Sequence, residues 1–195
     1  MFSSYDMHPV ATGFVPMFLP ATDYVSPFKS SRRPLIIWLV VAGIALLMML
    51  MVIGAPLAQA SGHSSLAFAI YGAFGKLCHQ LPERSFFIAG QKFAVCARCT
   101  GLYLGFTSLA LLYPLLKSLK HTDSPPRRWL FIAAVPMAVD FFLGYFGIWD
   151  NTHLSRFLTG FLLGGVVVFF VMPGLLEIDL VAWRQLFKRN SAALP

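Results

Sequence analysis

The chain has 195 residues, of which 57% are apolar and 12% charged, and its formal net charge is +7. With a mean hydropathy of +0.71, this composition is typical of an integral membrane protein and excludes an ordinary soluble domain. The basic residues cluster at the ends of apolar runs, where they set topology and contact anionic lipids. We therefore expect a lipid bilayer and no nucleic acid as partner.

Four apolar runs are long enough to cross a membrane. The run Leu35–Gly54 has no charge, and at about 1.5 Å per residue it covers a ~30 Å hydrocarbon core. A shorter run, Ser64–Leu77, fits a helix at the membrane interface. The sequence thus predicts an all-α membrane protein, a four-transmembrane-helix bundle with one short interfacial helix. The other predicted spans are Thr100–Leu116, Trp129–Trp149 and Leu154–Ile178.

The distribution of lysine and arginine predicts the orientation. Ten of the fifteen basic residues lie in the two tails and in the loop after the second span. Because cytoplasmic segments carry the excess of these residues, we expect both termini in the cytoplasm. The predicted parts are a cytoplasmic tail over 1–33, a membrane domain over 34–180 with an outer Cys/His loop over 55–99, and a cytoplasmic tail over 181–195.

The first span ends in a sequence that resembles a signal-peptidase site, Ala58-Gln59-Ala60. Its apolar run is longer than the ~7–15 residues usual in a cleaved signal peptide, and a long tail precedes it. We therefore expect the span to be retained.

The three cysteines of the chain lie close together in sequence. Cys78 is followed by His79, and the second span opens with Cys96-Ala-Arg-Cys99. Three thiols and one imidazole make the four ligands of a tetrahedral Zn²⁺ site, in which one ligand pair is commonly separated by two residues. We predict zinc bound by these four residues, with His63 or water as alternative fourth ligand. An iron–sulfur cluster is a weaker alternative, because three cysteines with one histidine form an uncommon cluster set.

Two other uses of the cysteines stay open. A Cys-x-x-Cys pair at a helix N-terminus feels the positive end of the helix dipole, and Arg98 adds a full charge, so Cys96 and Cys99 are candidates for redox chemistry. The layout is similar to that of quinone-linked disulfide-forming membrane enzymes, but those use a second cysteine pair and Cys78 is single. The remaining alternative is a structural disulfide that leaves one cysteine free.

Charged residues near the outer ends of the spans are further candidates. Asp140 lies within the third predicted span, where a charge costs at least ~2.5–3.5 kcal/mol and needs a partner. We predict that Arg156 is this partner and that Tyr103 or Thr159 completes the hydrogen bonding. The glycines Gly160, Gly164 and Gly165 predict close helix packing by the last span. Four basic residues lie on the outer side in the predicted topology: Arg84, Lys92, Arg98 and Arg156. They are expected either to form a basic pocket for an anionic lipid head group or a quinone carbonyl, or to be solvated loop charges.

The stretch CHQLPERSFFIAGQKFAVCARCTGLYLGF, which begins at Cys78, resembles the signature of a family of small prokaryotic membrane proteins of unknown function. Asn151, Thr159 and Gly160 also resemble family positions, whereas Phe141 stands where a glycine is expected. The resemblance covers about 71–171. It implies a multi-span protein of the prokaryotic cytoplasmic membrane with a cysteine-containing outer loop, and it implies no known reaction.

The predicted function is that of a metal-stabilised integral membrane protein, a subunit or scaffold that works with other membrane subunits and has no enzymatic activity. One alternative is a thiol–disulfide or quinone-linked oxidoreductase that uses Cys96 and Cys99. The other is a carrier of a small ligand or of protons that uses Asp140 and Arg156.

Overall fold

The computed structural model describes residues 32–120 and 122–191, and beyond Ile178 it describes the backbone alone. The predicted N-terminal tail, 1–33, lies almost wholly outside the described residues, as does the end of the predicted C-terminal tail, 192–195.

Four helices of the described residues are long and apolar enough to cross a membrane, which confirms the predicted fold class. They are α1 (Arg33–Ala60), α3 (Ala97–Leu116), α4 (Arg128–Tyr145) and α5 (His153–Ser191). The apolar part of α5 is His153–Ile178, close to the predicted span. The short helix is also confirmed as α2 (Ser64–Gly75). A 3-10 turn η1 (Pro82–Arg84) and a small hairpin of β1 (Phe87–Ile88) and β2 (Gln91–Lys92) precede α3.

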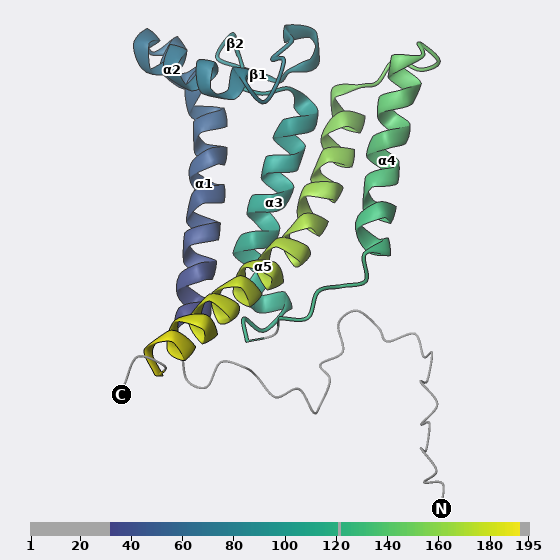
Figure 1. Cartoon of the computed structure of the whole chain (residues 1–195). Coiled ribbons are helices and arrows are strands. Elements are labelled where there is room, and N and C mark those ends of the chain that lie inside the picture. Colours follow the sequence, from purple (N-terminus) through teal and green to yellow (C-terminus); the bar gives the residue numbers. More distant parts are fainter. Residues whose placement is uncertain (1–31, 121, 192–195) are drawn as a thin grey trace, which may run out of the picture.

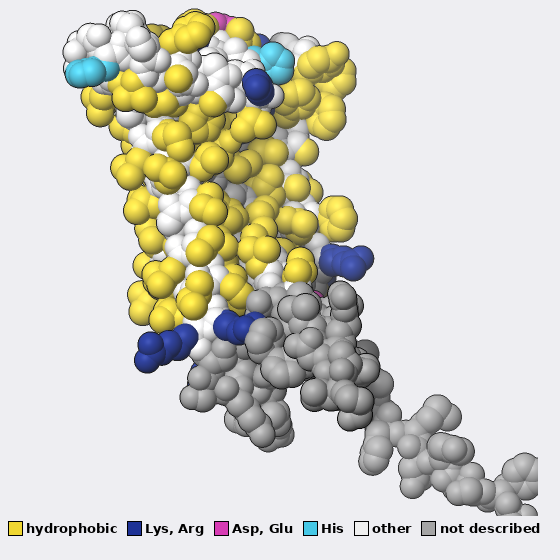
Figure 2. Space-filling model, turned by 60° about the vertical axis from the view of Figure 1, so that its left-hand side comes forward, with side chains coloured by type: hydrophobic (Ala, Val, Ile, Leu, Met, Phe, Trp, Pro, Cys, Tyr) yellow, Lys and Arg dark blue, Asp and Glu magenta, His cyan; other side chains and the backbone are white. Residues whose placement is uncertain are grey.

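The helices α1, α3 and α5 stand together, while α4 lies at the edge of the molecule, chiefly against α5 (Figure 1). α2, the hairpin and the α4–α5 connection lie at one end of the bundle, which we call the Cys face. α1 begins, α5 ends and α3 joins α4 at the opposite end (Figure 1). A belt of apolar side chains separates the basic residues at the two ends (Figure 2). This up-and-down arrangement fits the predicted topology, and the cytoplasmic location of the termini stays a prediction.

Small residues bring α3 and α5 into direct backbone contact. A Cβ atom built on Gly101 of α3 would lie 2.1 Å from the carbonyl oxygen of Phe157, and one on Gly164 of α5 would lie 2.1 Å from that of Leu102. Gly105 and Gly160 make equivalent approaches. Each helix thus carries two glycines four residues apart, the spacing that lets membrane helices pack closely. The packing role predicted for Gly160 and Gly164 agrees with this geometry.

Two prolines inside helices each leave one backbone carbonyl without its usual helical donor, and a donor from another part of the chain bonds to it. A proline inside a helix cannot donate to the carbonyl four residues earlier. Pro114 leaves the carbonyl of Ala110, which accepts a hydrogen bond from Trp38 Nε1 of α1 at 2.7 Å. Pro56 leaves the carbonyl of Val52, which accepts one from the Ala94 amide at 3.4 Å. These bonds tie α1 to α3 and to the segment that leads into α3.

We expect replacement of Trp38 by Phe to lower the free energy of unfolding by about 1 kcal/mol, because the Ala110 carbonyl loses its donor. Thermal unfolding in detergent measures the change. A Pro114→Ala background restores a donor within the helix, so there the Trp38→Phe change should cost less. Equal losses in both backgrounds would contradict the proposed role of the hydrogen bond.

The end of α4 differs from the prediction. The third span was expected to continue to Trp149, but α4 ends at Tyr145. Gly147 takes a left-handed conformation with φ 66°, and the Ile148 amide donates to the Leu143 carbonyl at 3.0 Å. This is a glycine-based helix end, in which the residue after the cap turns left-handed. As a result Asp140 lies five residues from the end of its helix, nearer to the Cys face than predicted.

Candidate functional site

The segment between α2 and α3 is held in place by side-chain to backbone hydrogen bonds. Gln80 has a left-handed backbone, φ 52°, which is costly for a residue with a Cβ. Its side-chain amide donates to the Tyr71 carbonyl at 2.8 Å, and its own carbonyl accepts from Lys92 Nζ at 2.8 Å. The turn at Gln80 therefore fixes the chain directly after Cys78 and His79.

The three cysteines meet where this segment joins α3. The Sγ atoms of Cys78, Cys96 and Cys99 lie within 4.8 Å of one another, and none of the three is in a disulfide. Cys96 is the N-cap of α3, and its amide donates to the Cys78 sulfur at 3.3 Å. Hydrogen bonds from the Cys96 and Cys99 thiols hold the pKa of the Cys78 thiol well below its usual range. The Cys78 sulfur therefore favours thiolate, the form that binds metals.

The histidines predicted as ligands lie outside this cluster. His79 is exposed, whereas Cys78 is buried, because adjacent side chains point in different directions. The imidazole of His63 lies 3.1 Å from the Ser61 hydroxyl. The structure therefore brings three of the four predicted zinc ligands together and leaves His79 apart from them.

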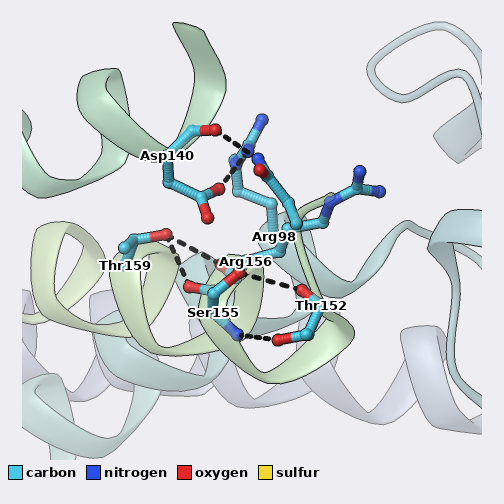
Figure 3. A network of polar contacts seen from close by, with 7 residues as sticks. Arg98, Asp140, Thr152, Ser155, Arg156 and Thr159 are labelled. Carbon is cyan, nitrogen blue, oxygen red and sulfur yellow. Dashed lines mark hydrogen bonds and ion pairs between the residues drawn. The ribbon is translucent and has the colours of Figure 1, made fainter. Parts of the chain in front are cut away.

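Asp140 pairs with Arg98, not with Arg156 as predicted. Asp140 is 9% exposed, and its Oδ2 atom forms an ion pair with Nη2 of Arg98 in the first turn of α3 (Figure 3). Its backbone carbonyl also accepts from the Asn151 side chain. The pairing follows from the early end of α4, which brings Asp140 level with the start of α3.

The other predicted partners of Asp140 are engaged elsewhere. The hydroxyl of Thr159 donates to the carbonyls of Ser155 and Arg156 in its own helix (Figure 3). The ring of Tyr103 packs edge-on against Phe74, with centroids 5.9 Å apart. Tyr103 thus belongs to the apolar cluster beside the cysteines.

A cavity of about 480 Å³ joins these parts at the Cys face. Its lining comes from the cysteine segment, from the first turns of α3 and α5, and from the end of α4. All three cysteines border it, and Arg84 and Arg156 contribute charged walls. The apolar side is formed by Phe141 and Tyr145, and the ring of Phe141 lies 5.6 Å from the Arg98 guanidinium. A metal held by the cysteines would therefore border a space large enough for a small ligand.

Arg98 as the partner of Asp140 is the functional residue that sequence reasoning missed. The pairing could have been predicted, because Arg98 lies at the start of the second span, at the same end of the bundle as the end of the third. The expected length of the third span placed Asp140 too deep in the membrane for this pairing to be considered. Asn151, which donates to the Asp140 carbonyl, also lies against Gly144 of α4: a Cβ built on Gly144 would lie 2.8 Å from the Asn151 carboxamide.

The comparisons with known proteins place this chain among predicted membrane proteins. Residues 78–170 match the model of a family described as predicted membrane protein (DUF2085). An uncharacterised protein of Methanocaldococcus jannaschii is 41% identical over 113 residues, which cover 58% of this chain and 72% of the relative. One from Methanothermobacter thermautotrophicus is 39% identical over 88 residues, 45% of this chain and 77% of that protein. No solved structure shows a significant match.

Proposed function

The chain belongs to the predicted membrane protein family DUF2085, as the sequence resemblance predicted, and we propose that it binds one Zn²⁺ through Cys78, Cys96 and Cys99. The observation that carries the proposal is the meeting of three Sγ atoms within 4.8 Å. Sulfur atoms around a tetrahedral zinc, at Zn–S distances of ~2.3 Å, lie about 3.8 Å apart. A small contraction of the cluster would therefore complete the site.

The environment of the cluster supports a metal over inert buried thiols. The Cys96 amide already donates to the Cys78 sulfur, and such contacts to a ligand sulfur orient it and stabilise its charged form. Cys96 is the N-cap of α3 and Cys99 lies in its first turn, so the positive end of the helix dipole faces the cluster. Because all three cysteines border the cavity, the fourth ligand is water or an entering group.

We propose a structural role for this metal. The cysteines join the segment after α2 to the start of α3, so one ion would link two parts of the chain separated by the hairpin. The apolar cluster of Val52, Phe74 and Val95 packs beside them. A chain stabilised in this way fits a subunit or scaffold for other membrane proteins, since little of α4 is buried within this chain.

The first experiment is elemental analysis of the full-length protein purified in detergent, with thiols counted after denaturation without reductant. We expect about one zinc per chain and three reactive thiols once the metal is removed. Cys78→Ser, Cys96→Ser and Cys99→Ser should each lose nearly all the zinc. His79→Ala is the matched control and should keep it, because His79 stands apart from the cluster.

Other results separate the alternatives. A metal-free protein with one reactive thiol would contain a disulfide, and the zinc proposal would fall. A thiol–disulfide or quinone-linked oxidoreductase, the second candidate, rests on the position of Cys96 and Cys99 at the helix N-terminus beside the cavity. It requires Cys96→Ser and Cys99→Ser variants that fold normally and fail to reduce or oxidise a quinone.

A further inference from the structure

The cavity at the Cys face concentrates positive charge. Arg84 of η1, Arg98 of α3 and Arg156 of α5 all line it, and no aspartate or glutamate is among its lining residues. Arg84 and Arg156 form no ion pair with any carboxylate of the described residues. Three guanidinium groups from three separate elements therefore line one space, and of the three only Arg98 is paired with a carboxylate of the described residues, that of Asp140.

The hydrogen-bonding capacity of these arginines is also incomplete. The Nε atoms of Arg98 and Arg156 are shielded from solvent, and neither has a hydrogen-bond partner. Arg156 is partly desolvated by burial, and the positive charges of Arg84 and Arg98 lie near enough to repel it. Buried donors without acceptors cost free energy, and like charges in one cavity add to that cost.

The backbone adds to the same field. α3 begins at Ala97 and α5 at His153, both at the Cys face (Figure 1). The N-terminal ends of helices carry partial positive charge and favour anions. The glycine contacts hold these two helix starts close together, with a Cβ on Gly160 placed 2.2 Å from the Arg98 carbonyl. The positive charge of the cavity is thus fixed by the packing of the spans.

We propose that this cavity binds a phosphate-type anion between Arg84, Arg98 and Arg156. One guanidinium group can bind two oxygens of the same phosphate through two parallel hydrogen bonds. The volume of about 480 Å³ falls within the range of small-ligand sites. Phe141 and Tyr145 offer an apolar wall for the rest of the ligand. The group is either a free phosphate compound or the phosphodiester of an anionic lipid, since the cavity lies at the end of the membrane spans.

The test uses the full-length protein in detergent after delipidation, with two probes. Binding of inorganic phosphate is measured by isothermal titration calorimetry, and binding of phosphatidylglycerol by native mass spectrometry against phosphatidylcholine as the neutral lipid. We expect saturable binding of one anion per chain. Arg156→Gln should weaken it by roughly tenfold to hundredfold, because it removes charge-assisted hydrogen bonds.

Two further variants keep the result interpretable. Arg84→Gln removes an exposed side chain of the cavity wall, and it should weaken binding even if Arg156→Gln folds poorly. Arg128→Gln, at the opposite end of the bundle, is the matched control and should leave binding unchanged.

Each outcome decides the proposal. Phosphate binding that depends on Arg84 and Arg156 supports a free phosphate compound. Phosphatidylglycerol binding with the same dependence, without phosphate binding, supports a lipid headgroup. Absence of both, or losses equal to that of Arg128→Gln, would overturn the inference. Zinc content is measured on the same samples, so a failure of the metal site is recognised separately.

Discussion

Replacing Gly101 with alanine will destabilise the protein by about 1–3 kcal/mol, the usual cost of overpacking a close-packed interface. The new methyl group would lie 2.1 Å from the carbonyl oxygen of Phe157. No rotamer can relieve this clash, because a Cβ has no torsion of its own and its neighbour is backbone. α3 and α5 must therefore move apart.

The sign of the effect makes the test sharp. In a helix, Gly→Ala is ordinarily favourable by up to ~1 kcal/mol. Gly43 and Gly174 are the matched controls, since a Cβ at either position meets nothing within 4 Å. Gly43→Ala and Gly174→Ala should be neutral or stabilising in thermal unfolding in detergent, whereas Gly101→Ala lowers the melting temperature. Equal behaviour of all three variants would contradict the direct backbone contact.

The same contact has consequences for the site. Gly160 of α5 faces the carbonyl of Arg98, one residue before Cys99. Separating the helices at this level would displace the first turn of α3, which carries two cysteines and the partner of Asp140. Gly160→Ala should therefore reduce zinc content as well as stability, while Gly174→Ala reduces neither.

The fold was largely predictable, because span length and charge depend on local sequence. Leu35–Gly54 is long and apolar enough to cross a membrane, and this can be read from its own residues. The end of α4 was not predictable in this way. The aromatic residues up to Trp149 continue the apolar pattern, and Gly147 ends the helix through its backbone conformation, which hydropathy does not record.

The candidate site shows the same division. The clustering of Cys78, Cys96 and Cys99 followed from their chemistry and spacing. Which side chains meet across helices depends on helix ends and rotations that one sequence does not specify. For this reason the ion pair between Arg98 and Asp140 was not predicted, although Arg98 is adjacent in sequence to the predicted ligand Cys99. The exclusion of His79 has the same origin, since the left-handed turn at Gln80 sets which way its neighbours face.

Replacing Asp140 with asparagine will destabilise the protein by about 3–5 kcal/mol, because removing one partner of a buried ion pair leaves the other charge uncompensated. Asp140 is 9% exposed and Arg98 21%, and the pair links α3 to α4. α4 packs chiefly against α5, and this ion pair attaches it to α3. Thermal unfolding in detergent measures the loss.

A double-mutant cycle separates the pair from either residue alone. Arg98→Gln should also destabilise, and the double variant Asp140→Asn with Arg98→Gln should recover part of the loss, since two neutral amides can hydrogen-bond each other. Simple additivity of the two losses would contradict a direct interaction.

The cycle also decides whether Asp140 carries protons or ligand. A carrier needs a carboxylate that exchanges partners, so Asp140→Asn would abolish transport and leave folding intact. The direct contact with Arg98, together with the bond from Asn151 to the Asp140 carbonyl, favours a fixed structural role. On that basis the loss will be one of stability, and the double variant Asp140→Asn with Arg98→Gln will recover part of it. A stable Asp140→Asn protein that has lost transport would instead identify the carboxylate as the working group of a carrier.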